Sequence, residues 1–106
     1  ERQVTVEMIL DQGKIDKTSS FGINEHCALI DKLDASDVFN AELDDNQVQN
    51  LSDYFVTLPS EAAMKLWTAL GTGDQSNVIS LHKATSSDGT KVSSRMVEML
   101  TGNKNG

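Results

Sequence analysis

The stretch LPSEAAMKLWTALG, residues 58–71, predicts the fold of this chain more clearly than any other part of it. Pro59 disfavours a helical conformation at the residue before it, and the hydroxyl of Ser60 can cap a helix that follows. Apolar side chains then repeat with helical spacing at Ala63, Leu66, Trp67 and Leu70. Gly71 suits the position just after a helix. We therefore expect a helix over residues 61–70.

Toward the N-terminus, the sequence predicts further short helices. Val4, Met8 and Leu10 fall on one face of a helix over residues 4–10, although Val4-Thr5-Val6 would also suit a strand. A polar loop over residues 16–20 follows. The next helix is expected over residues 24–33, with Asn24 as its cap. Its apolar stripe consists of Cys27, Ile30 and Leu33.

Two acidic breaks organise the middle of the chain. Asp34 is expected to end the preceding helix and to cap a second one over residues 34–43. The apolar face of that second helix consists of Val38, Phe39 and Leu43. Asp44-Asp45-Asn46 forms the other break and caps a helix whose apolar face consists of Val48, Leu51 and Phe55.

The C-terminal third is less regular. Val78, Ile79 and Leu81 form a short apolar piece that suits either a helix or a strand. Asp88-Gly89 is a turn signal, and a hairpin across it is an alternative to the helix that we favour for the last segment. That helix has its apolar face at Val92, Met96, Met99 and Leu100, and Gly102 is expected to end it.

These elements together predict an all-α fold. We expect one helical domain over residues 1–101, built as a compact bundle of five to seven short helices, and a flexible tail over residues 102–106. Only 38% of the residues are hydrophobic and 5% are aromatic. Chains this poor in large apolar side chains often complete their core by association, so we expect a homodimer.

The negative net charge of the chain comes entirely from residues 1–45. Residues 1–45 hold eleven acidic and four basic groups, a balance of −7, whereas residues 46–106 hold five of each. Phosphate affinity comes from Lys and Arg, so this balance argues against a protein that binds DNA alone. It also argues against binding to an anionic membrane surface. A basic protein partner fits it better.

No catalytic or metal-binding pattern stands out. Cys27 is the one cysteine, which fits a reducing cytoplasm, and its place on an apolar stripe indicates a buried structural thiol. His26 is its neighbour in sequence and would point elsewhere on a helix, so it cannot serve that thiol as a base. One Cys with His26 and His82 gives no ligand spacing for a metal. We expect no enzyme activity and no cofactor.

Two surfaces are candidates for binding. The helices over residues 24–33 and 34–43 resemble a helix-turn-helix, but residues 24–45 hold seven acidic groups against Lys32 alone. We therefore expect this region to bind a basic partner, and Trp67 to add apolar contact. The acidic candidates are Asp31, Asp34, Asp37 and Glu42. Any contact with nucleic acid would come from Lys83, Lys91 and Arg95.

The segment Gly22-Ile23-Asn24-Glu25, with Ala28 and Leu33 after it, resembles the helix opening of FlhD, the small all-helical subunit of the bacterial flagellar master regulator. The chain length is also similar. The resemblance implies a dimer that works with a larger partner of the FlhC type, which binds zinc and supplies much of the DNA specificity. On this basis DNA would be reached only through a complex.

The leading hypothesis is a cytoplasmic, non-enzymatic regulatory subunit that assists transcription through a basic partner. The alternative is an acidic inhibitor from a phage or mobile element that occupies a basic nucleic-acid site as a decoy. That alternative requires the carboxylates to line one surface. An enzyme built on Cys27 or a histidine is the least favoured of the three hypotheses.

Overall fold

Six α-helices follow the apolar periodicity of the sequence along residues 3–102, the part of the chain that this computed structural model describes. They are α1 (Val6–Leu10), α2 (Ile23–Ala35), α3 (Asp45–Thr57), α4 (Ser60–Gly71), α5 (Gln75–Lys83) and α6 (Val92–Thr101). Two single-turn 3-10 helices lie in the connections, η1 (Ile15–Thr18) and η2 (Val38–Asn40). The expected all-α bundle of short helices is therefore confirmed.

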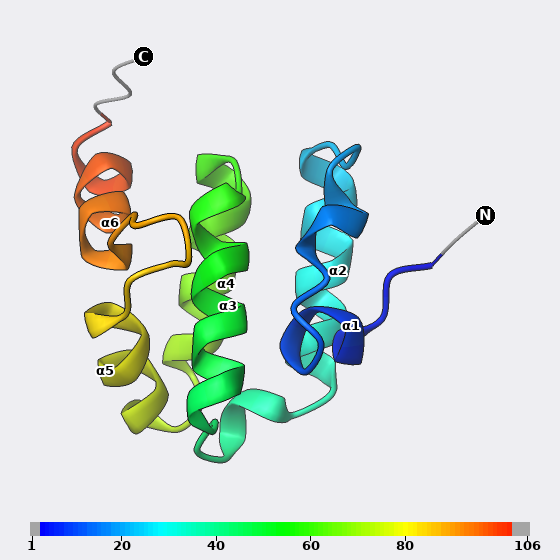
Figure 1. Ribbon diagram of the computed structural model, residues 1–106, viewed down its shortest axis with the longest axis horizontal. Coiled ribbons are helices and arrows are strands. Elements are labelled where there is room, and N and C mark those ends of the chain that lie inside the picture. The colour runs from blue at the N-terminus through cyan, green and yellow to red at the C-terminus, as the bar shows by residue number, and fades with distance from the viewer. Residues whose placement is uncertain (1–2, 103–106) are drawn as a thin grey trace.

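The helices form three layers. α3 and α4 lie in the middle, with α1 and α2 on one side and α5 and α6 on the other (Figure 1). The core lies between these layers, and the side chains of Leu51, Tyr54, Phe55, Leu66 and Leu70 are completely buried in it. None of the helices within residues 3–102 is long and apolar enough to cross a membrane.

The first helices differ from the prediction at their ends. α1 is helical as preferred, with Thr5 as its cap, but part of the expected loop over residues 16–20 belongs to η1. α2 starts one residue early, so the prediction of Asn24 as its cap was wrong. Gly22 takes the cap position instead, because its N–H donates to the carboxylate of Glu25 at 2.7 Å.

Two further predictions were also wrong: the end of this helix at Asp34 and the separate helix over residues 34–43. α2 continues past Asp34 because the N–H and hydroxyl of Ser36 both donate to the carbonyl of Leu33, at 3.2 and 2.7 Å. Asp37 then takes a left-handed conformation, with φ of 66°, which a continuous helix cannot contain. Only η2 follows, so the described residues hold no helix-turn-helix at this point. Phe39 and Leu43 are buried as expected.

The irregular connection after α2 is held by one buried side chain, Asn77 of α5. Its Nδ2 donates to the carbonyls of Phe39 and Ala41, at 3.1 and 2.9 Å. Its Oδ1 accepts from the N–H of Leu43 at 2.8 Å. A single carboxamide therefore supplies hydrogen bonds that a helix would have supplied within its own backbone.

The boundaries of the next two helices follow the sequence in part. Asp44 caps α3 as predicted, and its carboxylate accepts from the N–H of Gln47 at 2.8 Å. Ser60 is not a cap, because α4 already begins there and Pro59 takes the cap position. Gly71 belongs to α4 itself. The helix closes without a left-handed residue, through bonds from the N–H groups of Thr72 and Gly73 to carbonyls of the last turn.

The ambiguous apolar piece at residues 78–81 is helical, as part of α5. The turn at Asp88-Gly89 is present, and Gly89 takes φ of 92° there. The alternative hairpin is limited, within residues 3–102, to an isolated bridge between Thr85 and Lys91. α6 ends at Gly102, with φ of 71°, as predicted. The predicted tail over residues 102–106 lies almost wholly outside the described residues.

Candidate protein-interaction surface

α4 has a buried face and an exposed face. Ala62, Ala63, Leu66 and Leu70 are completely buried against the other helices. The opposite face carries side chains at intervals of three and four residues: Glu61, Met64, Lys65, Thr68 and Thr72. Because α2 and α6 flank this exposed face, a depression lies on each side of it.

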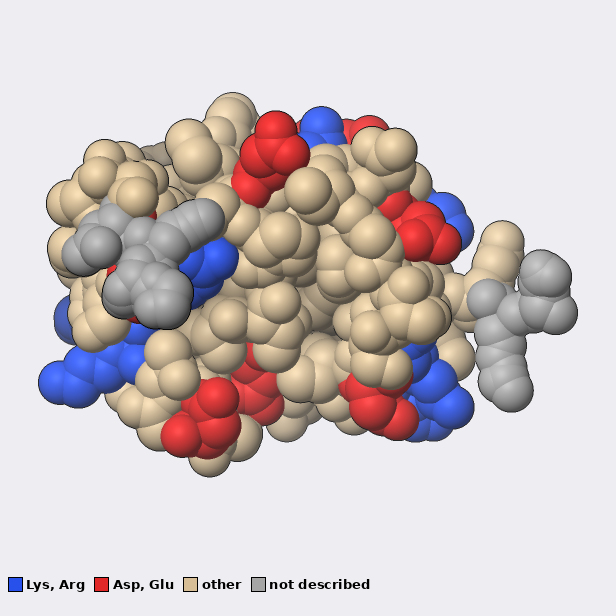
Figure 2. All heavy atoms as spheres, turned by 90° about the horizontal axis from the view of Figure 1, so that it is seen from above, with Lys and Arg blue, Asp and Glu red and all other residues tan. Residues whose placement is uncertain are grey.

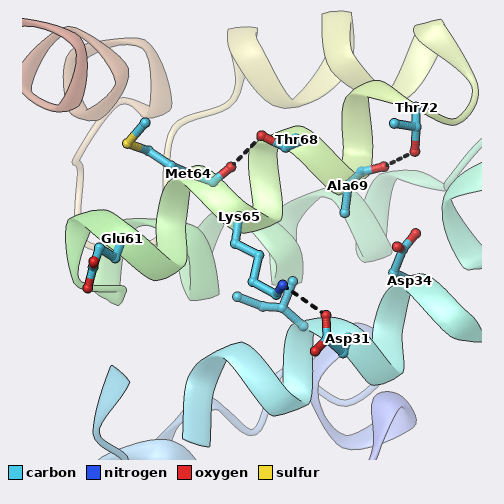
Figure 3. A pocket seen from close by; sticks show the side chains of 9 residues that line it. Asp31, Asp34, Glu61, Met64, Lys65, Thr68, Ala69 and Thr72 are labelled. Atoms are coloured by element: carbon cyan, nitrogen blue, oxygen red, sulfur yellow. Dashed lines mark hydrogen bonds and ion pairs between the residues drawn. The ribbon is translucent and has the colours of Figure 1, made fainter. Parts of the chain in front are cut away.

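The depression between α2 and α4, which we call the acidic furrow, has a volume of about 490 Å³. The residues that line it are Ile30, Asp31, Asp34, Glu61, Met64, Lys65, Thr68, Ala69 and Thr72. The carboxylates of Asp31 and Asp34 rise from α2 toward α4 (Figure 3). Sequence reasoning had placed both at a partner site, and the structure brings them together with Glu61.

Lys65 neutralises only part of this acidic charge. Its Nζ lies 3.0 Å from Oδ1 of Asp31. The hydrogen bond to Asp31 and the negative charge of that carboxylate raise the pKa of Lys65. The carboxylates of Asp34 and Glu61 form no hydrogen bond and no close ion pair among residues 3–102. The negative charge of Asp34 acts on Lys65 from farther away and also raises the pKa of Lys65. Three carboxylates and one ammonium group leave a net charge of −2 in the acidic furrow.

One of these carboxylates lies at the unfavourable end of its helix. α2 ends at Ala35, so Asp34 belongs to its last turn. The helix dipole places partial negative charge there, where acidic side chains are destabilising. Glu61, in contrast, lies in the first turn of α4, where a negative charge is favourable.

The depression on the other side of α4, which we call the apolar groove, has a volume of about 200 Å³. Its lining consists of Met64, Trp67, Thr68, Met96, Met99 and Leu100. Met64 lines both depressions, and its side chain extends away from Asp31 and Asp34 (Figure 3). The residue is 48% exposed. Leu100 is 73% exposed. The groove therefore leaves apolar surface in contact with water, close to acidic side chains.

Trp67 joins this groove to the core. It is half-buried, and its ring lies 5.8 Å from that of Phe55 between centroids. The ring of His82 lies 6.3 Å from that of Trp67 between centroids. The sequence had predicted Trp67 both as a core residue and as a partner contact, and its half-buried position is compatible with both.

The other two acidic candidates lie elsewhere. Asp37 is engaged in local structure, because its carboxylate accepts from the side chain of Asn40 at 2.9 Å. Glu42 is exposed in the connection before α3. Neither residue lines the acidic furrow or the apolar groove.

The basic candidates are near one another but differ in availability. Lys83 ends α5 and Lys91 precedes α6, and both side chains are exposed. Arg95 is more constrained, since its Nη2 donates to the carbonyl of Leu58 at 2.8 Å. Its Nη1 also lies 3.3 Å from the carboxylate of Glu98.

Many acidic side chains outside the furrow stabilise local structure. Asp74 caps α5 by accepting from the N–H and hydroxyl of Ser76, and these bonds lower the pKa of Asp74. Asp53 accepts from the N–H and hydroxyl of Ser87, at 2.7 and 2.8 Å, and so holds the 86–90 turn against α3. In Figure 2, acidic and basic side chains alternate around the rim of the face shown. That face gives no support to a continuous acidic surface.

His26 and Tyr54 form a separate buried pair. Nδ1 of His26 lies 2.9 Å from the hydroxyl of Tyr54. Burial lowers the pKa of His26 and raises the pKa of Tyr54. His26 also lines a depression with Ile15, Thr18 and Phe21. Cys27 is half-buried on the next position of α2. Within residues 3–102, no three His, Cys, Asp or Glu side chains are grouped so that they could hold a metal.

Sequence reasoning missed Glu61 and Lys65 as site residues. The signal was present, because both occupy positions of α4 that its core residues leave free. What the sequence could not supply was the neighbour, since only the fold places Asp31 and Asp34 beside that face. No family model, curated protein or solved structure matches this chain.

Proposed function

We propose that this protein is a non-enzymatic regulatory subunit that binds a basic partner protein through the acidic furrow. The observation that carries the proposal is the net negative charge of the acidic furrow, where Asp34 and Glu61 lie on two facing helices and form no close ion pair. Complementary charge across an interface mainly increases the association rate and fixes the orientation of the partner. A basic protein is the class of molecule that such a surface attracts.

The resemblance to FlhD supports a role in transcription control. The residues that carry it, Gly22 to Glu25, build the start of α2, the same helix that presents Asp31 and Asp34. In the proposal, the chain forms a homodimer and reaches DNA only within a complex with its partner. Lys83 and Lys91 are then the first candidates for an auxiliary contact with phosphate.

The direct test is charge reversal in the acidic furrow. The double variant Asp34→Lys, Glu61→Lys changes both unpaired carboxylates. Glu42→Lys is the control for charge reversal outside the furrow, because Glu42 is also exposed but does not line it. Tagged proteins would be expressed in the source cells, and co-purifying proteins would be compared by mass spectrometry.

The proposal predicts a basic partner that co-purifies with the wild type and with Glu42→Lys but not with the double variant. Its binding to purified wild-type protein should weaken as salt rises. Equal recovery of all partners by the double variant would contradict the proposal. So would tight, salt-sensitive binding of the isolated protein to duplex DNA, because phosphate affinity of this kind belongs to a stand-alone DNA binder.

A further inference from the structure

The acidic furrow and the apolar groove are two sides of one surface, because Met64 and Thr68 line both. We propose that this surface seats a single amphipathic helix of the basic partner. The apolar stripe of that helix fills the groove between α4 and α6, and Lys or Arg on its flank extends over the furrow between α2 and α4. This inference rests on the proposed function and adds the form of the partner's binding segment.

The apolar groove exposes apolar surface that a binding partner would cover. α6 packs on α5 and α3, whereas its contact with α4 is slight, so a groove lined by Met64, Met96 and Leu100 remains open between the two helices. Val97, on the same helix, is 59% exposed. Apolar surface gathered beside charged residues is typical of interaction sites. Methionine side chains suit this role, because they adapt to the shape of what binds.

A helix fits the groove better than an extended segment does. The groove is bounded by α4 and α6, and the lining residues Met64 and Thr68 are one helical turn apart, as are Met96 and Leu100. Side chains of a docked helix repeat at the same interval, so apolar anchors at i, i+3, i+4 and i+7 can follow the groove. Binding of an extended segment by strand addition would need a strand edge, and residues 3–102 form no strand that could offer one.

The charge around the groove selects a basic partner over a second copy of this chain. The net charge of the chain is −7. A symmetric dimer through this face would bring Asp34 and Glu61 of one subunit toward the same acidic surface of the other. Like charges brought together across an interface are strongly unfavourable. A helix with one apolar and one basic side can place the apolar side in the groove and the basic side over the acidic furrow.

Trp67 allows a direct binding test, because it is the single tryptophan of the chain and it lines the groove. The probe is a synthetic peptide of about 18 residues, or about five helical turns, with Leu at i, i+3, i+4 and i+7 spacing and Lys elsewhere. A scrambled peptide of the same composition, with no apolar face, is its control. Neither contains tryptophan, so any change in emission comes from Trp67.

We expect the amphipathic peptide to shift the Trp67 emission and to saturate, and the scrambled peptide to bind at least tenfold more weakly. Leu100→Glu and Met64→Glu should each weaken the amphipathic peptide about tenfold, or about 1.4 kcal/mol. Ile79→Glu is the matched control. Ile79 is 57% exposed on α5 and lies outside the groove, so this variant should bind as the wild type does. Circular dichroism checks that each variant is folded.

The outcomes separate the two proposals. Equal binding of both peptides, with no effect of Leu100→Glu or Met64→Glu but loss in Asp34→Lys, Glu61→Lys, would overturn the helix-in-groove inference and leave the acidic furrow as the docking site. If neither peptide binds, while the acidic furrow still recruits a basic protein from cells, the inference is again wrong and the proposed function stands. A protein dimer that Leu100→Glu dissociates would show that a second copy occupies the groove.

Discussion

Replacing Asn77 by alanine is expected to destabilise the protein more than any change to an exposed side chain. Asn77 is 1% exposed, and its carboxamide makes three hydrogen bonds to the connection between α2 and α3. That connection contains no α-helix, and three of its backbone groups bond to this side chain. Asn77→Ala removes all three bonds and leaves the connection otherwise unchanged.

The size of the expected loss in stability depends on which hydrogen-bond partners each backbone group keeps without Asn77. The N–H of Leu43 loses its acceptor inside the protein, which costs about 1–3 kcal/mol. The carbonyl of Phe39 keeps the N–H of Asp74 at 2.8 Å, and Ala41 is exposed, so its carbonyl can return to water. Each of these two lost bonds costs about 0.5–1 kcal/mol. The sum is a loss of about 3 kcal/mol in the free energy of unfolding.

Urea denaturation followed by the fluorescence of Trp67 measures this loss. With a slope of about 1.5 kcal/mol/M, the midpoint should fall by about 2 M while the slope stays the same. Asn24→Ala is the control, because Asn24 is exposed and its side chain forms no hydrogen bond within the described residues. It should change stability by less than about 0.5 kcal/mol. A loss below about 1 kcal/mol in Asn77→Ala would show that the connection does not depend on this carboxamide.

Three further changes test other parts of the structure. Gly73→Ala should lower the free energy of unfolding by about 2 kcal/mol in the same assay, because its Cβ would lie 2.1 Å from the carbonyl oxygen of Phe39. Gly71→Ala is the matched change at an open helical site with no described atom within 4 Å, and it should stabilise by about 0.5 kcal/mol; equal effects of the two would refute the close approach. Burial lowers the pKa of His26, so the unfolded chain binds its proton first as the pH falls. Stability should therefore be constant above about pH 6.5 and decrease below it, by up to about 1.4 kcal/mol per pH unit, and His26→Gln should remove this slope in urea midpoints measured from pH 5 to 8. In a Lys65→Met background, which removes the attraction between Asp34 and Lys65, Asp34→Lys should raise Tm slightly in a thermal melt at low salt, because it removes a negative charge from the C-terminal end of α2; a lower Tm would contradict the dipole argument.

The helices with strong apolar repeats were predictable from the sequence. The spacing of Leu66 and Leu70 fixed the inward face of α4, and Asp44 marked the start of α3 by a cap that the structure contains. The failures lie where backbone groups are satisfied over long distances in the chain. The pattern of Phe39 and Leu43 suggested a helix, but Asn77, more than thirty residues away, provides the hydrogen bonds that made a helix unnecessary.

Some residues of the candidate site were predictable from the sequence, and others were not. Asp31, Asp34 and Trp67 were expected at a partner surface because of their charge or size, and they line the two depressions beside α4. Glu61 was not, because a single acid at a helix start is explained by the helix dipole alone. Its proximity to the acids of α2 depends on the packing of α2 against α4, which a local pattern does not encode.

The order of the layers has a consequence for local unfolding. α1 and α2 join the rest of the protein mainly through α3 and α4, and so do α5 and α6 (Figure 1). Either outer pair can therefore open while the central pair stays folded, and the amide hydrogens of α3 and α4 should be the last to exchange with solvent. A helix bound along α4 would touch α2 and α6 together. Its binding would therefore slow amide hydrogen exchange in both outer layers at once.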